Sequence, residues 1–286
     1  VLACRSKTRC EHAMANISAQ VPDGVGSLEV SLLDLNDFDS VRAFADRWGD
    51  RPLHLLINNA GIMALPQHTL SPSGVEMQMN VNHMGHFLLT GLLLPNLRAS
   101  APARVVDVSS RAGARLGQHL DVTDLGWTRR DYNMLYAYGA SKIANVLHAK
   151  ELTRRMAAEG VDVTAYSLHP GVIHTELMRN VVQYHWSVDL LVNYIAGPLV
   201  SPLLKTPVEG AQTTLYLATA PHAALGTPEE EAEVGGAVIP GAYYDDCALV
   251  KHPVPMAYDA KAATDLWTAS EGITGWKYEA PGADAA

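Results

Sequence analysis

Residues 53–61, Leu-His-Leu-Leu-Ile-Asn-Asn-Ala-Gly, decide the fold, because here an apolar run ends in two amides and two small residues. A short apolar run that stops at turn-forming residues is typical of a strand buried on both faces of a parallel sheet. Small residues at the end of such a strand let a ligand approach the backbone. An ordinary Asn/Gly turn has the same composition, so this stretch alone predicts a strand and leaves its use open.

Similar apolar runs recur along the chain and alternate with longer helical patterns. We expect strands at residues 1–4, 28–32, 53–57, 104–108, 162–168 and 237–239, and helices at residues 37–48, 74–97, 138–158 and 208–220. This alternation indicates an α/β fold with a doubly wound parallel sheet, the Rossmann arrangement. With 286 residues, 48% of them hydrophobic, a single domain over residues 1–280 can bury the core. The Ala/Gly/Asp-rich residues 281–286 are expected to be a disordered tail.

The bulk composition excludes some classes of partner. A formal charge of −9 and a pI near 5.7 argue against a general affinity for nucleic acid. The three cysteines, Cys4, Cys10 and Cys247, contain no C-x-x-C pair and fit a reducing compartment better than a disulfide framework. The same sparse set gives no reason to expect a metal site.

The sequence shows no segment that spans a membrane. The apolar stretch 187–204 is interrupted by Asp189, Asn193, Pro198 and Pro202, so it lacks the run of about 18 apolar residues that a spanning helix needs. The wider region 181–204 is compatible with a lipophilic entrance, plain core, a homo-oligomer contact or peripheral contact with a membrane. We expect a cytoplasmic or organellar protein, plastids included, whose targeting information would lie before Val1.

Tyr138 and Lys142 are four residues apart on a predicted helix, so both side chains leave from one face. A tyrosine has an ordinary pKa of about 10, and an ammonium one turn away favours the phenolate and lowers that pKa toward the working range of a general base. Such a pair taken alone is usually an exposed surface pair, so its surroundings decide its meaning.

Two further polar sites accompany this pair. Ser109 and Ser110 end the predicted strand 104–108, at the edge where open α/β sheets bind their ligands, although a plain Ser-Ser turn would look the same. Asn82 lies in a mostly apolar helix, where an amide needs a hydrogen-bond partner, either structural or functional.

Seven motifs occur in an order and spacing that together resemble one family. They are Ala-Cys-Arg at residues 3–5, Leu-Asp-Leu at 33–35, Asn-Asn-Ala-Gly at 58–61, Asn-Val-Asn-His-Met-Gly-His-Phe at 80–87, Val-Ser-Ser at 108–110, Tyr-Gly-Ala-Ser-Lys-Ile-Ala-Asn at 138–145 and His-Pro-Gly-Val-Ile-His-Thr-Glu-Leu at 169–177. This set resembles the short-chain dehydrogenase/reductase superfamily. It is most similar to the retinol dehydrogenase-like group, which includes the WW-domain oxidoreductase and the chloroplast inner-envelope translocon dehydrogenase. The similarity extends from Val1 to Trp276.

The resemblance implies a role for each matching polar residue. Tyr138 would be the general acid/base, and Lys142 would lower its pKa and bind the nicotinamide ribose. Ser110 would orient the substrate oxygen, since the family's serine aligns with the second of the Ser109–Ser110 pair. Asn82 would hold a water of the proton relay. The insertion between Ser110 and Tyr138 is expected to form part of the substrate pocket.

The resemblance also implies a nucleotide cofactor. Arg5 would pair with the 2′-phosphate of NADP where NAD-dependent members carry an acidic residue, so NADP is favoured, although an arginine on a solvated turn is the plain alternative. The other expected cofactor contacts are Asp34, Leu35, Asn58, Asn59, Ala60, Gly61, Val81, Pro170, Gly171, Val172 and Thr175, together with Tyr138 and Lys142.

One feature of the family does not occur in this sequence. Members of the family begin with a strand and a Thr-Gly-x-x-x-Gly-x-Gly loop that binds the pyrophosphate, and the chain has no such motif. We therefore expect the first strand and the Gly-rich loop to be missing, with two unpaired strand edges facing a gap in the sheet. On this expectation the chain alone folds poorly and binds NADP weakly.

Two functions follow from the resemblance. The first is NADP-dependent transfer of a hydride between nicotinamide and the CH–OH or C=O group of a lipophilic alcohol, aldehyde or ketone, as in a retinol dehydrogenase or carbonyl reductase. The alternative is an NADP-binding redox sensor or translocon-associated scaffold with little turnover. The four filled catalytic positions favour the first function.

Overall fold

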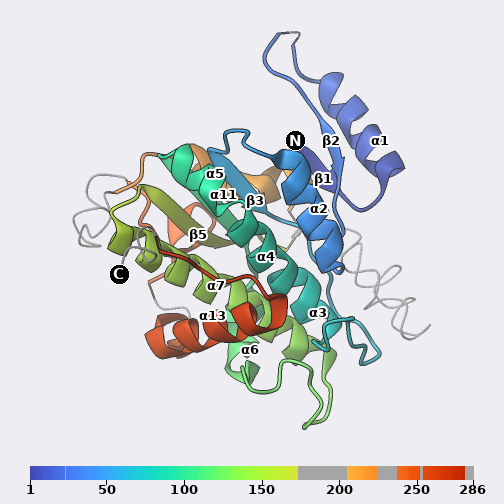
Figure 1. Cartoon of the computed structure of the whole chain (residues 1–286), viewed down its shortest axis with the longest axis vertical. Helices are drawn as coiled ribbons and strands as arrows, with labels where there is room; N and C mark the ends of the chain where they lie inside the picture. The colour runs from blue at the N-terminus through green and yellow to red at the C-terminus, as the bar shows by residue number, and fades with distance from the viewer. Residues whose placement is uncertain (23, 173–204, 224–236, 252–253, 281–286) are drawn as a thin grey trace.

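The computed structural model describes residues 1–22, 24–172, 205–223, 237–251 and 254–280 (Figure 1). Its strands are β1 (Leu2–Cys4), β2 (Val30–Leu32), β3 (Leu55–Asn58), β4 (Ala103–Val108), β5 (Val163–His169), β6 (Tyr243–Asp245) and β7 (Ala248–Leu249). Its helices are α1 (Lys7–Ser18), α2 (Phe38–Trp48), α3 (Met77–Met79), the π-helical turn η1 (Asn80–Met84), α4 (Gly85–Leu92), α5 (Leu94–Ala99), α6 (Arg111–Leu116), the 3-10 turn η2 (Gly117–His119), α7 (Met134–Glu159), α11 (Pro207–Thr219), the 3-10 turn η6 (Pro255–Tyr258) and α13 (Ala260–Thr274). The predicted α/β class is confirmed. The predicted tail at 281–286 and the apolar region 181–204 lie outside the described residues.

The strands form two sheets. One has the order β3-β4-β5-β6-β7, in which all neighbours are parallel except β6 and β7, and the other is the parallel pair β1-β2. The expected break in the sheet is present, because β1 and β3 do not pair and both line one cavity. In Figure 1, α1 and β2 extend away from the body that the five-stranded sheet and its helices form.

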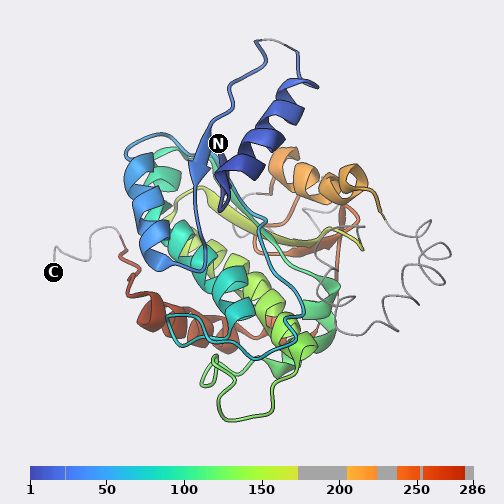
Figure 2. The same cartoon turned by 90° about the vertical axis from the view of Figure 1, so that its right-hand side faces the viewer.

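The five-stranded sheet is covered on both faces (Figure 2). Successive residues of β4 point in opposite directions, so Val105 packs in the cluster beneath α4 and α7, whereas Val106 packs with Leu217 of α11. All seven residues of β5 are buried. Burial on both faces explains why apolar residues occur on both faces of β4, as at Val105 and Val106. The site-bearing edge of the sheet therefore rests on the best-packed part of the molecule.

Polar residues at the helix ends hold the long helices in place. Asn133 caps α7 by accepting hydrogen bonds from the backbone N–H groups of Leu135 and Tyr136, and Gly160 ends the same helix in the left-handed conformation. At α11, Thr206 and Glu209 form a reciprocal capping box. Within the described ranges, every helix is too short or too polar to cross a lipid bilayer.

Two of the predicted elements are wrong in detail. The single helix expected at residues 74–97 is divided into α3, η1, α4 and α5, with a π-helical turn at Asn80–Met84 and a break at Leu93, which Pro95 follows. The strand expected at 237–239 is a single bridge between Val238 and His222, and the strand that pairs with β5 is Tyr243–Asp245. Pro240 supplies no backbone N–H for a ladder, so pairing resumes only beyond it.

Three helices, α1, α6 and α13, have no counterpart among the predicted elements. The reason is clearest in α1, where Cys10 is the one fully buried residue and no apolar stripe marks the helix in the sequence. In contrast, the predicted helices at 37–48, 138–158 and 208–220 are confirmed as α2, α7 and α11. The single domain over 1–280 stays a prediction.

Candidate active site

Helix α7 presents Tyr138 and Lys142 at the edge of the sheet. Both side chains are buried, with exposed fractions of 5% and 4%, and the Lys142 Nζ lies 5.8 Å from the centroid of the Tyr138 ring. The ammonium donates a hydrogen bond to the Val108 carbonyl at 3.0 Å, at the end of β4. The pair is therefore an internal one, anchored to the central strand, and the exposed surface pair is excluded.

The serine that reaches Tyr138 is Ser110. Its side chain caps α6 by accepting a hydrogen bond from the Ala112 N–H at 3.1 Å, and the same hydroxyl lies close enough to the Tyr138 phenol to lower its pKa. Ser109 is buried, and its hydroxyl donates to the Lys142 carbonyl. Geometry therefore agrees with the choice of Ser110 over Ser109.

Asn82 connects the π-helical turn to this group. Its amide nitrogen donates to the Ser141 hydroxyl and to the Ile62 carbonyl, each at 2.9 Å, and its amide oxygen accepts from the Ile62 N–H at 2.8 Å. The hydrogen-bonding need of a buried amide is thus met by groups next to the Tyr138–Lys142 pair. The four predicted catalytic residues lie together at one edge of the sheet.

Gly61 is the residue of the Asn-Asn-Ala-Gly stretch that comes nearest to the pair. A Cβ at this position would lie 3.1 Å from the Asn82 Oδ1 and 3.3 Å from the Lys142 Nζ. Both atoms belong to groups that are already hydrogen-bonded, so a side chain at residue 61 would displace them. The backbone at Gly61 therefore lies close to Asn82 and Lys142, and its approach to a cofactor stays a prediction.

Burial dominates the electrostatics of the pair. It lowers the pKa of Lys142 to about 8, although the charge of Asp107 acts in the opposite direction. Burial also raises the pKa of Tyr138, and the hydrogen bond with Ser110 opposes this only in part. This direction is the reverse of the expected one, because the Lys142 ammonium faces Val108 and the ring of Tyr138 instead of the phenol oxygen.

A cavity of about 660 Å³ lies between β1 and β3. It is lined by many of the predicted cofactor residues, namely Arg5, Asp34, Leu35, Asn58, Asn59, Ala60, Gly61 and Val81. The amide nitrogen of Asn58 does not face this cavity, because it donates hydrogen bonds to Thr90 and Asp107 in the interior. The Asn58 side chain therefore serves the core, and its contact with a cofactor stays a prediction.

The predicted contacts at the end of β5 lie on the same edge as Ser110. Val108 and Leu168 are register partners, and the Arg111 N–H donates to the His169 ring, which immediately precedes Pro170. Gly171 adopts a φ of +92°, which favours glycine, and Val172 is exposed. Thr175, the remaining predicted contact, lies outside the described residues.

Arg5 and Arg9 are the cations of the cavity. Both line it and both are exposed, and neither forms a hydrogen bond or ion pair with any residue in the described ranges. Sequence reasoning singled out Arg5 and missed Arg9. The signal was present, because Arg9 follows Arg5 at a spacing of four and lies in the first turn of α1, just beyond Arg5.

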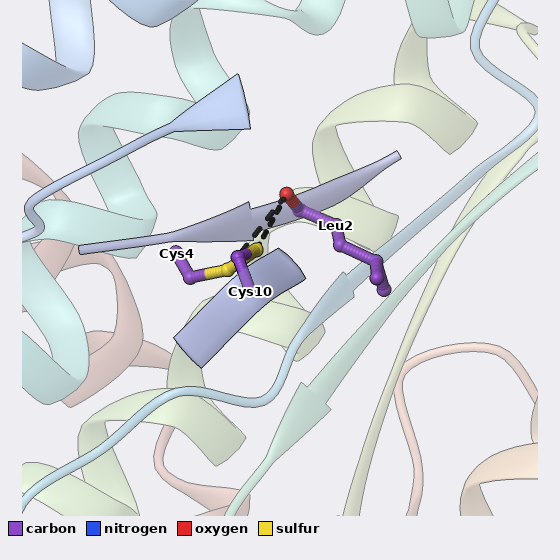
Figure 3. Close-up of a disulfide and its surroundings, with 3 residues drawn as sticks. All are labelled: Leu2, Cys4 and Cys10. Atoms are coloured by element: carbon purple, nitrogen blue, oxygen red, sulfur yellow. Dashed lines mark hydrogen bonds between the residues drawn. A yellow bond between two sulfur atoms is a disulfide. The ribbon is translucent and has the colours of Figure 1, made fainter. Parts of the chain in front are cut away.

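The cysteines next to Arg5 depart from the expectation. Cys4 and Cys10 form a disulfide with a Cα–Cα distance of 6.1 Å (Figure 3). The expectation of no disulfide is therefore wrong. Cys4 ends β1 and Cys10 lies in the first turn of α1, so the tight strand-to-helix turn brings together two side chains whose spacing matches no C-x-x-C motif.

A buried polar group below the pair was also missed. Asp107 of β4 accepts hydrogen bonds from His148 at 2.7 Å and from Asn58 at 2.8 Å, and all three residues are at least 95% buried. The sequence signal was the carboxylate inside Val-Val-Asp-Val, because a charged residue is rare in a strand that is buried on both faces.

Comparisons with known proteins agree with this geometry. A family model described as short chain dehydrogenase matches residues 1–122. Retinol dehydrogenase 13 of Homo sapiens is 41% identical over 98% of this chain and 78% of that protein, and retinol dehydrogenase 14 of Homo sapiens is 39% identical over 96% and 78%. The crystal structure of an uncharacterised protein from Mycobacterium paratuberculosis has a TM-score of 0.66 at 33% identity, covering 97% of this chain and 84% of that one.

The chain belongs to the short-chain dehydrogenase family, and within it the chain is retinol dehydrogenase-like. Members of this family use nicotinamide cofactors, and the chain is accordingly an oxidoreductase that acts on CH–OH donors. The expected fold and family are thereby confirmed.

Proposed function

We propose that this chain is an NADP-dependent oxidoreductase that interconverts a lipophilic alcohol with its aldehyde or ketone. The observation that carries the proposal is the arrangement of Ser110 and Lys142 around the Tyr138 phenol and ring, with Asn82 tied to the same helix through Ser141. A proton donor, a hydroxyl that holds an oxygen and a nearby cation are what reduction of a carbonyl requires.

Each side chain has a defined task in this reaction. A bound nicotinamide would supply the hydride acceptor or donor. In the oxidative direction the Tyr138 phenolate takes the proton of the alcohol, and in the reductive direction the phenol returns it to the carbonyl oxygen. Ser110 holds that oxygen by a hydrogen bond. Lys142 would bind the nicotinamide ribose, and Asn82 would hold the water that connects the pair to solvent.

The residues present fit NADP at two places. Arg5 and Arg9 are cations without partners among the described residues, at the end of the cavity that also contains Asp34. A guanidinium recognises a phosphate through parallel hydrogen bonds, which suits the 2′-phosphate that distinguishes NADP from NAD. At the other end, Ala60 and Gly61 line the cavity, and Gly61 lies beside the Lys142 ammonium that would bind the ribose.

The lipophilic substrate rests on the relatives. Two proteins about 40% identical to this chain are retinol dehydrogenases, and their names indicate a long apolar alcohol. A retinoid is therefore the first substrate to test, followed by medium-chain aldehydes and aromatic ketones.

The test is NADPH oxidation with all-trans-retinal and the other carbonyl compounds. Tyr138→Phe is expected to lower turnover by at least about a hundredfold, which is the usual contribution of a general acid. Tyr136→Phe is the matched control, since Tyr136 lies on the same helix but is exposed and stacks on His119. Nucleotide binding without turnover in the unmodified chain would overturn the proposal and favour the redox sensor or scaffold.

Cofactor choice is tested separately by nucleotide binding. Arg5→Ala is expected to weaken NADPH by about tenfold or more while NADH changes little, because only NADPH carries the phosphate that the guanidinium pairs with. Lys7→Ala removes the same charge from the same segment, where Lys7 faces Glu11, and serves as the control. Equal losses for both nucleotides in Arg5→Ala would contradict the assignment of NADP.

A further inference from the structure

The buried polar group beneath the catalytic pair is centred on Asp107. Asp107 is 1% exposed and His148 is 5% exposed, and the His148 Nδ1 lies 2.7 Å from the Asp107 Oδ2. The other carboxylate oxygen accepts from the Asn58 amide at 2.8 Å, since Asn58 and Asp107 are register partners on β3 and β4. A buried carboxylate needs both a counter-charge and hydrogen bonds. Asn58 and His148 provide the hydrogen bonds.

Helix α7 aligns this group with the active site. Tyr138, Lys142, Asn145 and His148 follow one another at spacings of four, three and three residues, so all four lie on one face of the helix. The Val108 carbonyl accepts from the Lys142 ammonium at 3.0 Å and from the Asn145 amide at 3.1 Å. The ammonium is therefore fixed on one residue of β4, and the carboxylate belongs to the preceding residue.

The ionised members of the group are Asp107 and Lys142. Burial opposes ionisation of Asp107, but the His148 ring and the Asn58 amide hold its pKa below the ordinary value. From η1 and α4, His83 and His86 also face the group, and burial lowers their pKa values to about 3 and about 4, which makes both rings neutral. From α13 the contacts are uncharged, through Trp267 and Ser270.

The His148 ring is placed to support an anion. Its Nδ1 faces the carboxylate, whereas its Nε2 is buried without a hydrogen-bond partner in the described part of the chain. Phe87 and Trp267 enclose the ring, each with a centroid distance of 5.8 Å. A ring that donates from Nδ1 to the carboxylate satisfies this arrangement and holds Asp107 in place.

We propose that the Asp107–His148 pair is a positioning device for Lys142, in which the carboxylate keeps the buried ammonium charged and the imidazole keeps the carboxylate in place. The consequence for catalysis rests on the proposed function, but the effect on Lys142 itself does not. In the low-dielectric interior a single carboxylate has a large effect on a neighbouring ammonium.

The direct test is a pH titration of Lys142 in the full chain, followed by NMR of lysine labelled with carbon-13 at Cε. Lys142→Met identifies the signal by its loss. Asp107→Asn keeps the shape but removes the charge, and it is expected to lower the pKa of Lys142 by about one unit or more from its value of about 8. Thr90→Val is the control, because Thr90 accepts from Asn58 in the same network without carrying a charge. An unchanged titration in Asp107→Asn overturns the proposal.

A second variant keeps the test decisive where Asp107→Asn fails to fold. His148→Leu removes a donor to Asp107, and a smaller fall in the pKa of Lys142 is expected, whereas His148→Asn supplies an amide donor and restores it. Identical titrations in the two variants and in the unmodified chain would overturn the role of the imidazole.

Turnover gives an independent readout. Asp107→Asn is expected to move the alkaline limb of the pH–rate profile down by a unit or more, because Lys142 loses its proton earlier, whereas a purely structural defect lowers the rate equally at every pH. Absence of any turnover would count against the proposed function and leave the titration of Lys142 to decide the present inference.

Discussion

The two sheets of this molecule have similar strand sequences, but they differ in how deeply the side chains of those strands are buried. In the five-stranded sheet, every residue of β5 is buried, and Val105 and Val106 of β4 are fully inaccessible. In the two-stranded sheet, Leu32 of β2 is 47% exposed, and beside the gap Leu55 and Ile57 of β3 are 37% and 40% exposed. Apolar strands thus become core only where a neighbour covers them on each side.

This difference in burial divides the candidate site into two halves, one on the five-stranded sheet and one on the two-stranded sheet. Tyr138, Lys142 and Ser110 are anchored to α7 and β4, which lie in the best-packed region. Arg5 follows β1, a strand of three residues whose one partner is β2. The proton-transfer groups are therefore held by the core, whereas the cation for the nucleotide phosphate is held by the smaller sheet.

The largest expected effect is in amide hydrogen exchange. Backbone amides of β4 and β5 are expected to exchange at least about a thousandfold more slowly than those of β1 and β2, because opening the two-stranded sheet exposes little apolar surface. Exchange followed by NMR or mass spectrometry at neutral pH checks this. Similar protection in both sheets would mean that the smaller sheet is as firmly held as the larger one.

The next effect concerns the contact between the halves at Gly61. Gly61→Val is expected to lower turnover by about a hundredfold, because the new side chain would displace the Asn82 amide or the Lys142 ammonium, and small displacements of catalytic groups have effects of this size. Gly26→Val is the matched control, since no atom lies within 4 Å of a Cβ at Gly26. Equal activity in the two variants would show that the site tolerates a side chain there.

The smallest effect, taken per histidine and per pH unit, is the acid sensitivity of the large sheet. The folded-state pKa values of His83 and His86 are lowered from 6.5 to about 3 and about 4, so below pH 6.5 the unfolded chain binds protons that the folded chain does not. The free energy of unfolding is expected to be independent of these histidines above pH 6.5. As pH falls from 6.5 toward 4, it decreases by up to about 1.4 kcal/mol per pH unit for each histidine.

Urea unfolding at pH 7, 6 and 5 measures this slope. His83→Gln keeps a nitrogen donor for Ser270 and is expected to reduce the slope, whereas His54→Gln, at an exposed position, leaves it unchanged. A slope that is the same in all three proteins would show that His83 is protonated in the folded state.

Local patterns allowed much of the fold and site to be predicted. The strands β1 to β5 and the helix α7 follow from apolar runs and from one helical face. Tyr138 and Lys142 lie on that face, Ser110 follows a strand end, and Asn82 lies within the predicted helical segment 74–97. Properties that depend on register and on packing could not be predicted in this way. The pairing of Asn58 with Asp107 comes from the β3–β4 register, and the Cys4–Cys10 bond comes from the sharpness of the β1–α1 turn.

The predicted direction of the Tyr138 pKa shift was wrong for a related reason. Helical spacing places an ammonium one turn away, but only the three-dimensional structure shows that Val108 accepts its hydrogen bond and that burial outweighs the charge. The π-helical turn at Asn80–Met84 likewise depends on the partners of Asn82 in two other segments.

The ring of Trp267 lies parallel to that of His148, with an interplanar angle of 11° and a centroid distance of 5.8 Å. Indole emission responds to the packing and polarity around the ring, so Trp267 is an internal optical reporter of the buried polar group beside it. The fluorescence of the unlabelled chain during urea unfolding therefore contains a signal from the floor of the active site, which Trp267→Phe isolates by difference.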